Sequence, residues 1–412
     1  MAVLGIVAEF NPFHNGHLYF INEAKAQYDF STVVCVMSGN FTQRGEPALC
    51  NKWVRTEMAL ANGVDLIIEL PLVFASRSAY NFAKGAISLL NNTGVISHLA
   101  FGSEINDINI LQKIALLLNN EPAKYREILA KFLAKGHNYP VARSYALAEF
   151  YSDSKIFEVL TGSNNILAIE YLRVLAEINS PIIPFTIKRQ GASYHSTFLT
   201  EFASATAIRN ALYQGIDITK LSTSMPVASN SILLREMGLG RIPIDYHIWE
   251  QLIIARIRTM KTEDIELLLD VTEGLEKRIM AKSNQNTNLP ELILGIKSKR
   301  YSYSRINRIL LYALFNISKS LINELDSYDP LYYHVLGFTD KGKAVLEKIQ
   351  LKSHLPIISR GRDIKNIYND KNSPAGKMIQ LDIMATNLYN LLYPNPDYRI
   401  GDSDYTTSPL IF

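Results

Sequence analysis

Hydrophobic residues in the first third of the chain fall into two alternating patterns. Short runs rich in β-branched residues alternate with longer segments whose apolar positions lie three or four residues apart. The first pattern is typical of buried strands and the second of amphipathic helices, so together they predict an α/β fold with a helix-covered parallel sheet. The predicted strands are 3–9, 32–39, 65–70, 98–102 and 182–189, and the predicted helices are 17–27, 52–62, 79–90, 108–135, 140–150, 165–178 and 204–213.

Strand signals become sparse beyond about residue 240, where amphipathic stretches such as 246–260 and 305–317 dominate. A chain of 412 residues is long enough for two or three domains. We therefore predict a first domain over 1–215 and a second, mainly helical domain over 216–412. The second domain is expected to carry a small mixed α/β element near 332–360 and a last helix near 374–393.

Composition narrows the class of protein only slightly. With 48% hydrophobic and 20% charged residues, the chain should fold without long disordered segments. A net charge of +3 is too small to indicate a polyanionic partner. Two cysteines, Cys35 and Cys50, fit a reducing compartment, and we find neither a basic leader nor an apolar run long enough to span a bilayer. These features predict a cytoplasmic protein with no membrane partner.

The segment AEFNPFHNGHL, residues 8–18, is the most informative motif because it joins the first predicted strand to the first helix. A helix N-terminus at this edge of a parallel sheet favours bound phosphate. His14 and His17 lie one turn apart and can donate to the same phosphate, and Gly16 allows a close approach. Donors fixed near an α-phosphate would stabilise the charge that develops during attack.

Two other interpretations of the motif remain. The histidines could simply cap a helix in an ordinary loop. A zinc site is also conceivable, but only Glu9 could add a third ligand, so we predict no metal bound by the protein itself.

The motif resembles the HIGH motif of the nucleotidyltransferase superfamily. SATAIR, residues 204–209, looks like the ISSTxIR element that closes over the triphosphate in these enzymes. Ser204 and Thr206 can cap a helix that binds phosphate, with Arg209 as a counter-charge. The resemblance implies a Rossmann-like parallel sheet of the HIGH type. The alternative for this segment is a capped surface helix.

A closer resemblance, to the tRNA(Met) cytidine acetate ligase family, extends over nearly the whole chain. It rests on GIVAEFNPFHNGH, MSGNFTQRGEPA, VDLIIELP, FGSE, SNNILAIEYLR and the Lys188-Arg189 region. The family implies a ligase that uses ATP and acetate to make acetyladenylate. It then transfers the acetyl group to N4 of the wobble cytidine of elongator tRNA(Met). We expect Mg²⁺ to accompany the triphosphate.

The resemblance also implies which residues contact ATP. Gly102 could otherwise be a turn glycine, Asn165 a helix cap and Arg189 a solvated charge at a strand end. The predicted ATP-binding residues are Val7, Ala8, Glu9, Phe10, Asn11, Pro12, Phe13, His14, Asn15, Gly16, His17, Leu18, Tyr19, Phe20, Gly102, Asn165, Arg189, Ser204 and Arg209, with His14 and His17 as the catalytic pair.

A polar loop after the second predicted strand lies at the same edge of the sheet. Its residues Ser38, Gly39, Asn40 and Arg44 are candidates for binding the substrate carboxylate or the incoming base, although any loop after a strand could look similar.

The stretch from residue 296 to 311 contains basic and aromatic residues and no acidic residue. Cations of this kind offset phosphate charge and tyrosines can stack on unpaired bases. A solvated helix face with chance clustering is the alternative. The candidate tRNA contacts are Lys297, Lys299, Arg300, Tyr301, Arg305 and Arg308.

Two rival functions remain. One is a small-molecule adenylyltransferase of the nicotinate or pantetheine type. The other is a nucleotide-sensing RNA-binding protein without turnover. Fold alone does not choose among them.

Overall fold

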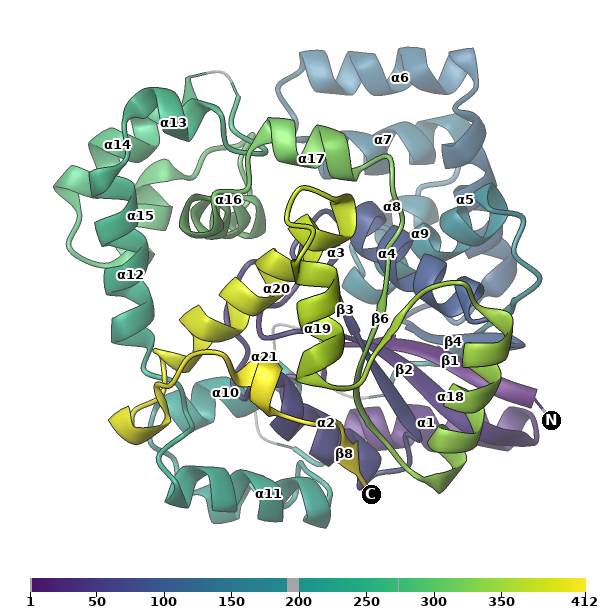
Figure 1. The fold of residues 1–412 in the computed structure, drawn as a ribbon. Helices are drawn as coiled ribbons and strands as arrows, with labels where there is room; N and C mark the ends of the chain where they lie inside the picture. The colour runs from purple at the N-terminus through teal and green to yellow at the C-terminus, as the bar shows by residue number, and fades with distance from the viewer. Residues whose placement is uncertain (1, 191–199, 273) are drawn as a thin grey trace.

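The structure, a computed structural model, describes residues 2–190, 200–272 and 274–412 and is built around one sheet (Figure 1). Its strands run in the order β5-β4-β1-β2-β3-β6-β7, and β8 pairs with β6. The strands are β1 (Ala2–Ala8), β2 (Phe30–Ser38), β3 (Leu66–Leu70), β4 (His98–Ser103), β5 (Ile183–Lys188), β6 (Tyr333–Phe338), β7 (Ile357–Ile358) and β8 (Leu410–Ile411).

The first five strands are all parallel, which confirms the predicted α/β arrangement. Their carboxyl ends therefore meet at one edge, where ligands bind in open α/β sheets. β6 extends the same sheet by pairing antiparallel with β3. Strands from both predicted domains thus belong to one sheet, an arrangement that the local pattern of the sequence did not indicate.

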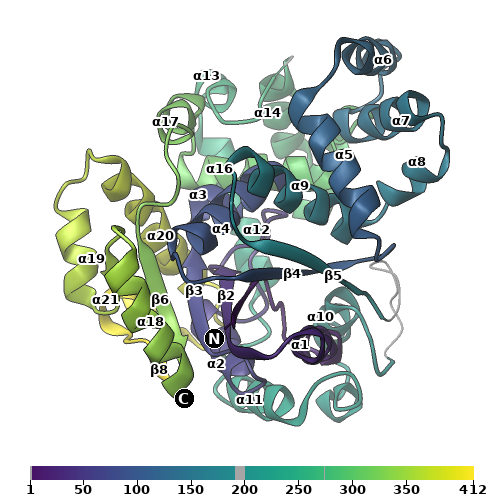
Figure 2. The same cartoon turned by 90° about the vertical axis from the view of Figure 1, so that its right-hand side faces the viewer.

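Helices from the first half of the chain cover both faces of the sheet (Figure 2). Val34 and Val36 of β2 point into one hydrophobic cluster, whereas Val33 and Cys35 point into the other, as the alternation of side chains along a strand requires. The helices are α1 (Asn15–Gln27), α2 (Lys52–Leu60), α3 (Leu72–Ala75), α4 (Ala79–Asn92), α5 (Ile108–Asn120), α6 (Ala123–Ala134), α7 (Tyr139–Tyr151), α8 (Lys155–Val159), α9 (Ser163–Glu177) and α10 (Ala205–Tyr213).

The second half of the chain is mainly helical, as predicted. Its Trp249 and Leu311 belong to the same hydrophobic cluster as Val34, so the two halves share a core. The elements are η1 (Ile218–Leu221), α11 (Val227–Gly238), α12 (Tyr246–Thr259), α13 (Thr262–Glu266), α14 (Leu275–Gln285), α15 (Leu289–Ile296), α16 (Tyr303–Phe315), α17 (Lys319–Leu325), α18 (Asp340–Lys352), α19 (Gly361–Tyr368), α20 (Pro374–Asn390), η2 (Pro396–Tyr398) and α21 (Ser403–Thr406).

Most predicted elements are present with small shifts at their ends. The helical segment predicted over 108–135 is two helices, α5 and α6, and the mixed element near 332–360 comprises β6, α18 and β7. The last predicted helix corresponds to α20. Among the described residues, we find no helix with the length and apolar character needed to cross a bilayer.

Candidate active site

The first helix, α1, is capped by the two histidines of the motif. His14 is the N-cap residue, and its Nδ1 accepts a hydrogen bond from the backbone N–H of Gly16 at 3.0 Å. The Nδ1 of His17 accepts from the backbone N–H of His14 at 3.2 Å. The two side chains therefore form a reciprocal capping box, with histidines in the places usually taken by Ser or Thr and by Glu or Gln.

These hydrogen bonds determine the tautomer of each imidazole. Because both Nδ1 atoms accept, each neutral ring carries its proton on Nε2, where it can donate. Burial, with the nearby Arg189 and Arg209, lowers the pKa of His14 to about 3. Burial, with His14 and Arg189, also lowers the pKa of His17 well below its usual value. The helix thus opens on two neutral N–H donors whose ring centres lie 3.8 Å apart.

Aromatic side chains and a glycine hold this pair in place. The rings of Phe10 and Phe13 lie 5.0 and 5.5 Å from the ring of His17, measured between centroids. A Cβ atom at position 16 would come within 2.8 Å of the His14 ring. Gly16 is therefore needed so that the imidazole can fold back over the helix start.

The rest of the predicted loop runs from the end of β1 into α1. Glu9 accepts a hydrogen bond from the backbone N–H of Gln43 at 2.7 Å, and burial raises the pKa of its carboxyl group. The amide of Asn15 donates to the carbonyls of Glu201 and Thr223. Val7 and Ala8 end β1, Pro12 is buried beside Phe13, and Leu18, Tyr19 and Phe20 lie half-buried on the first turns of α1.

The second predicted motif meets the first in space. Ser204 caps α10, as expected, by accepting from the backbone N–H of Ala207 at 3.1 Å. One turn on, Arg209 donates to the carbonyl of Asn11 at 2.7 Å and to the hydroxyl of Thr206 at 3.1 Å. The guanidinium is thereby held against the segment 8–18 that carries both histidines, which we call the histidine loop.

Arg189 and Gly102 lie on the neighbouring strands β5 and β4, at or just beyond their carboxyl ends. The backbone N–H of Arg189 donates to the carbonyl of Ser103, which extends the pairing of these strands. No atom of the described residues lies within 4 Å of the point where a Cβ atom of Gly102 would be. Gly102 therefore has free space beside its Cα atom near the carboxyl end of β4, as far as the described residues extend.

Asn165 occupies a different position from the one that a helix cap would take. It is the third residue of α9, and the cap comes from Glu104, whose carboxylate accepts from the backbone N–H groups of Asn164 and Asn165. The Asn165 side chain is buried and accepts from the Ser103 hydroxyl at 2.8 Å. Its observed role is to join α9 to the end of β4.

The polar loop after β2 is largely buried. Asn40 accepts from the backbone N–H of Lys52 at 2.8 Å, and the Glu69 carboxylate fills the space beside Gly39. Arg44 is half-buried, and its charge lies near Glu9. The hydroxyl of Ser38 is buried and has no hydrogen-bond partner among the described residues.

Sequence reasoning missed Arg55, a fully buried side chain of α2. Its guanidinium donates to the carbonyls of Cys50 at 3.1 Å and Glu9 at 2.6 Å, and also to that of Gly39. These carbonyls lie in the loops that follow β1 and β2. Arg55 therefore joins the two loops, and because its partners are backbone atoms the sequence carried no signal for it.

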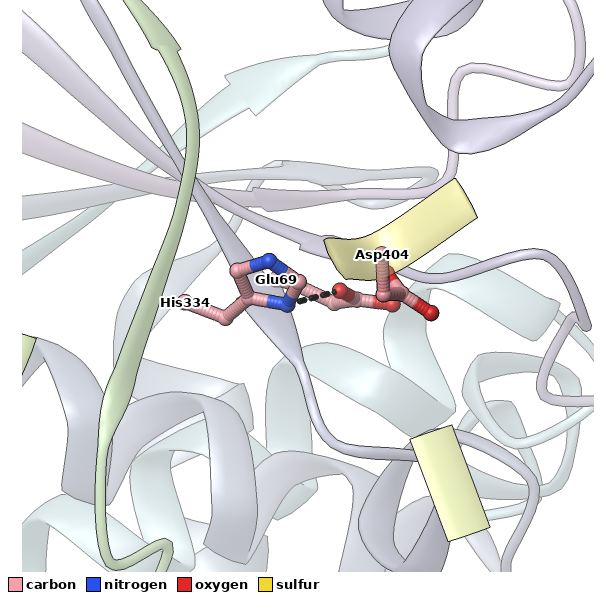
Figure 3. Close-up of side chains that lie close together, drawn as sticks. All are labelled: Glu69, His334 and Asp404. Atoms are coloured by element: carbon pink, nitrogen blue, oxygen red, sulfur yellow. Dashed lines mark ion pairs between the residues drawn. The ribbon is translucent and has the colours of Figure 1, made fainter. Parts of the chain in front are cut away.

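Lys52, the first residue of α2, is completely buried. Its ammonium lies 2.7 Å from the carboxylate of Glu69 and 2.5 Å from that of Asp404. His334 contacts Glu69 at 2.7 Å (Figure 3). Glu69, His334 and Asp404 lie close enough together to hold a metal ion, but the Lys52 ammonium already contacts both carboxylates. We call these four residues the core charge network.

The basic and aromatic stretch divides into exposed and buried members. Lys297, Lys299 and Arg300 are exposed. Tyr301 is buried with its hydroxyl donating to the carbonyl of Thr272, and the Arg305 guanidinium stacks on its ring and donates to the carbonyl of Asp270. Arg308 is also buried. In this conformation Tyr301 and Arg308 are not accessible to a bound nucleic acid.

Comparison with known proteins gives a consistent result. A family model described as HIGH nucleotidyl transferase matches residues 1–404. The chain is 51% identical to the tRNA(Met) cytidine acetate ligase of Syntrophomonas wolfei, covering 100% of this chain and 99% of that protein. It is 42% identical to the protein of the same name from Halothermothrix orenii, with 98% of each chain covered.

Solved structures agree. Crystal structures of Thermotoga maritima TmcAL are 37% identical to this chain. The apo structure has a TM-score of 0.96 and covers 100% of both chains. The structure bound to α-thio ATP has a TM-score of 0.94 and covers 100% of this chain and 99% of that one.

Proposed function

The chain belongs to the HIGH nucleotidyltransferase family, within its group of tRNA(Met) cytidine acetate ligases, and on this premise we propose that it acetylates tRNA in two steps. In the first, a carboxylate oxygen of acetate attacks the α-phosphorus of ATP. The bond from that phosphorus to the bridging oxygen breaks, pyrophosphate leaves, and acetyladenylate forms. In the second, N4 of the wobble cytidine of elongator tRNA(Met) attacks the acetyl carbon. AMP leaves and the amine loses a proton to water.

The observation that carries the proposal is the pair of neutral imidazoles at the start of α1. Each presents an Nε2–H donor, and neither donor needs to be reoriented when a phosphate arrives. Negative charge accumulates on the α-phosphate oxygens and on pyrophosphate during attack, and donors fixed in advance stabilise it. The helix N-terminus and the charges of Arg189 and Arg209 favour the same anion.

Other residues have supporting roles. The absence of a side chain at Gly102 lets the ribose or adenine approach the backbone of β4, and Asn165 holds the adjacent helix in place. The hydroxyl of Ser38, which has no hydrogen-bond partner among the described residues, and the charge of Arg44 suit a small carboxylate such as acetate. Mg²⁺ would enter with ATP as part of the substrate complex, and a tRNA substrate places the reaction in the cytoplasm.

Acetate-dependent exchange of labelled pyrophosphate into ATP, measured without tRNA, tests the first step. We expect exchange with acetate and none with nicotinate mononucleotide or phosphopantetheine, the substrates of the rival adenylyltransferases. Mass spectrometry of nucleosides from tRNA incubated with protein, ATP and acetate tests the second step. N4-acetylcytidine is the expected product, whereas nucleotide binding with neither exchange nor acetylated tRNA would favour a sensor without turnover.

A further inference from the structure

A groove opens between the turn that joins α6 to α7 and the linker that joins α15 to α16. Its volume is about 640 Å³, which lies within the range of about 300–1,000 Å³ that is usual for ligand sites. It is lined by Gly136, His137, Asn138, Val141, Leu294, Lys297, Ser298, Lys299, Ser302 and Tyr303. We call it the α7–α16 groove.

Among the described residues, the lining of this groove has positive charge and no acidic side chain. Lys297 and Lys299 are exposed, and neither pairs with a carboxylate in the part of the chain that the structure describes. The ammonium of Lys297 lies 4.1 Å from the centre of the Tyr303 ring, and that ring is 49% exposed. A cation is thus held beside an accessible aromatic surface.

Backbone contacts keep the groove in shape. The Asn138 amide donates to the carbonyl of Lys299 at 3.2 Å, which joins segments 161 residues apart in the sequence. Arg278 donates to the carbonyls of Gly295 and Lys297, both at 2.9 Å. The linker that carries the two lysines is therefore fixed before any ligand binds, which lowers the entropic cost of binding.

Two helix starts add to the positive potential of the groove. Asn138 caps α7 and Ser302 caps α16, and both caps are among the lining residues. The positive ends of two helix dipoles therefore face a groove that already has lysines and His137 in its walls.

We propose that the α7–α16 groove binds an unpaired nucleotide of the tRNA substrate at a position separate from the cytidine that reacts. Lys297, Lys299 and His137 contact its phosphate, and Tyr303 offers a surface for its base. In both views, α6, α7 and α16 lie toward the end of the molecule opposite α10 and α11 (Figures 1 and 2). The inference rests on the proposed function in taking tRNA as the ligand.

The chemistry of the groove favours RNA over other ligands. A small metabolite is usually held in an enclosed pocket that buries most of its surface, whereas this groove is open and has two exposed lysines in its walls. Single-stranded nucleic acid is held by positive grooves with aromatic side chains on which bases stack. An acidic peptide would use the lysines but would gain little from the Tyr303 ring.

Three variants of the full chain test the proposal. Lys297→Ala with Lys299→Ala removes the two cations, and Tyr303→Ala removes the ring. The matched control is Lys343→Ala with Lys348→Ala, which removes two exposed lysines from α18. The measurements are the Kd for tRNA at several salt concentrations, the KM and kcat for acetyl transfer, and acetate-dependent pyrophosphate exchange without tRNA.

We expect the double lysine variant to bind tRNA more weakly and with less dependence on salt. Two lost phosphate contacts on a single strand reduce the slope of log K against log salt by about 1.4. Tyr303→Ala should weaken tRNA binding by about 5- to 150-fold, the range of one lost base stack. For all three variants, pyrophosphate exchange and the kcat at saturating tRNA should match the parent protein.

The proposal would be overturned if the groove variants bound tRNA with the affinity and salt slope of the control. It would also be overturned if polyglutamate competed with tRNA for the groove and Tyr303→Ala had no effect, since those results indicate an acidic peptide site. Failure of the proposed function gives a different result. The parent protein would then not acetylate tRNA, although the groove variants would still bind tRNA more weakly than the control.

Discussion

Two groups of ionisable side chains are buried in this protein. They differ in how an unpaired buried charge is avoided, because one group is uncharged and the other consists of ion pairs. In the histidine loop, His14 and His17 stay neutral, and the Nε2–H of each ring has no hydrogen-bond partner among the described residues. In the core charge network, Lys52 is charged and contacts two carboxylates. The two histidines thus keep hydrogen-bond donors for a ligand, whereas the core charge network uses its donors and acceptors within the protein.

The pKa shifts follow the same division. Burial alone would lower the pKa of Lys52, but Asp404 and Glu69 outweigh it and raise that pKa above its usual range. Burial would likewise raise the pKa of Glu69, but Lys52 and His334 lower it to about 2. For His14, burial and two arginines act in the same direction and keep the ring neutral. A buried polar group is therefore best assigned to structure or to function by counting its partners.

Lys52→Met should give the largest effect. It leaves the carboxylates of Glu69 and Asp404 buried without a cation, so the free energy of unfolding should fall by about 3–5 kcal/mol. Urea denaturation measures this, with the exposed Lys343→Met as the control, expected within about 0.5 kcal/mol of the parent.

A triple variant keeps this prediction testable if Lys52→Met does not fold. Adding Glu69→Gln and Asp404→Asn removes both uncompensated charges and should recover part of the lost stability. A Lys52→Met protein as stable as the parent would show that the core charge network has no structural role.

At pH 7, substitutions in the histidine loop should change the reaction rate and not the stability. His14→Asn and His17→Gln keep acceptors suited to a capping box but remove the Nε2–H donors. Each should slow acetate-dependent pyrophosphate exchange by about 10²–10³-fold, the usual loss for one donor to a developing oxyanion. The thermal midpoint should change little. Exchange at the parental rate in both variants would exclude the imidazoles as phosphate donors.

The smallest effect is a dependence of stability on pH. The unfolded chain binds a proton at His14 below about pH 6.5, whereas the folded chain does not do so until about pH 3. Stability should therefore fall as the pH drops from 6.5, by about 2 kcal/mol for His14 at pH 5, and His17 should add to the fall in the same direction. The contribution of Glu69 has a lower window, being present above about pH 4.3 and lost toward pH 2.

His14→Asn should flatten this profile between pH 6.5 and 5. The matched control is His247→Asn, because the side chain of His247 is 74% exposed. Urea denaturation at each pH gives the slope. An unchanged slope in His14→Asn would mean that the imidazole is protonated in the folded protein.

The sequence predicted the features that depend on local pattern. Strand and helix periodicity, the cap at Ser204 and the position of His14 and His17 at a helix start all follow from neighbours in the chain. The pairing of β6 with β3 depends on which distant segments meet, so no local pattern reveals it.

The same limit applies to single residues. The burial of Lys52 has no local signal, because its partner Asp404 lies near the other end of the chain. The cap of α9 comes from Glu104 on a different element, and the pattern of the 296–311 stretch did not distinguish the buried Tyr301 from the exposed Tyr303.

The most direct test of the account is a crystal structure of this protein with a non-hydrolysable ATP analogue and acetate. The account predicts that the Nε2 atoms of His14 and His17 both lie within about 3.2 Å of phosphate oxygens at the start of α1. A triphosphate bound away from that helix start, or imidazoles that turn their Nδ1 atoms toward it, would contradict the account.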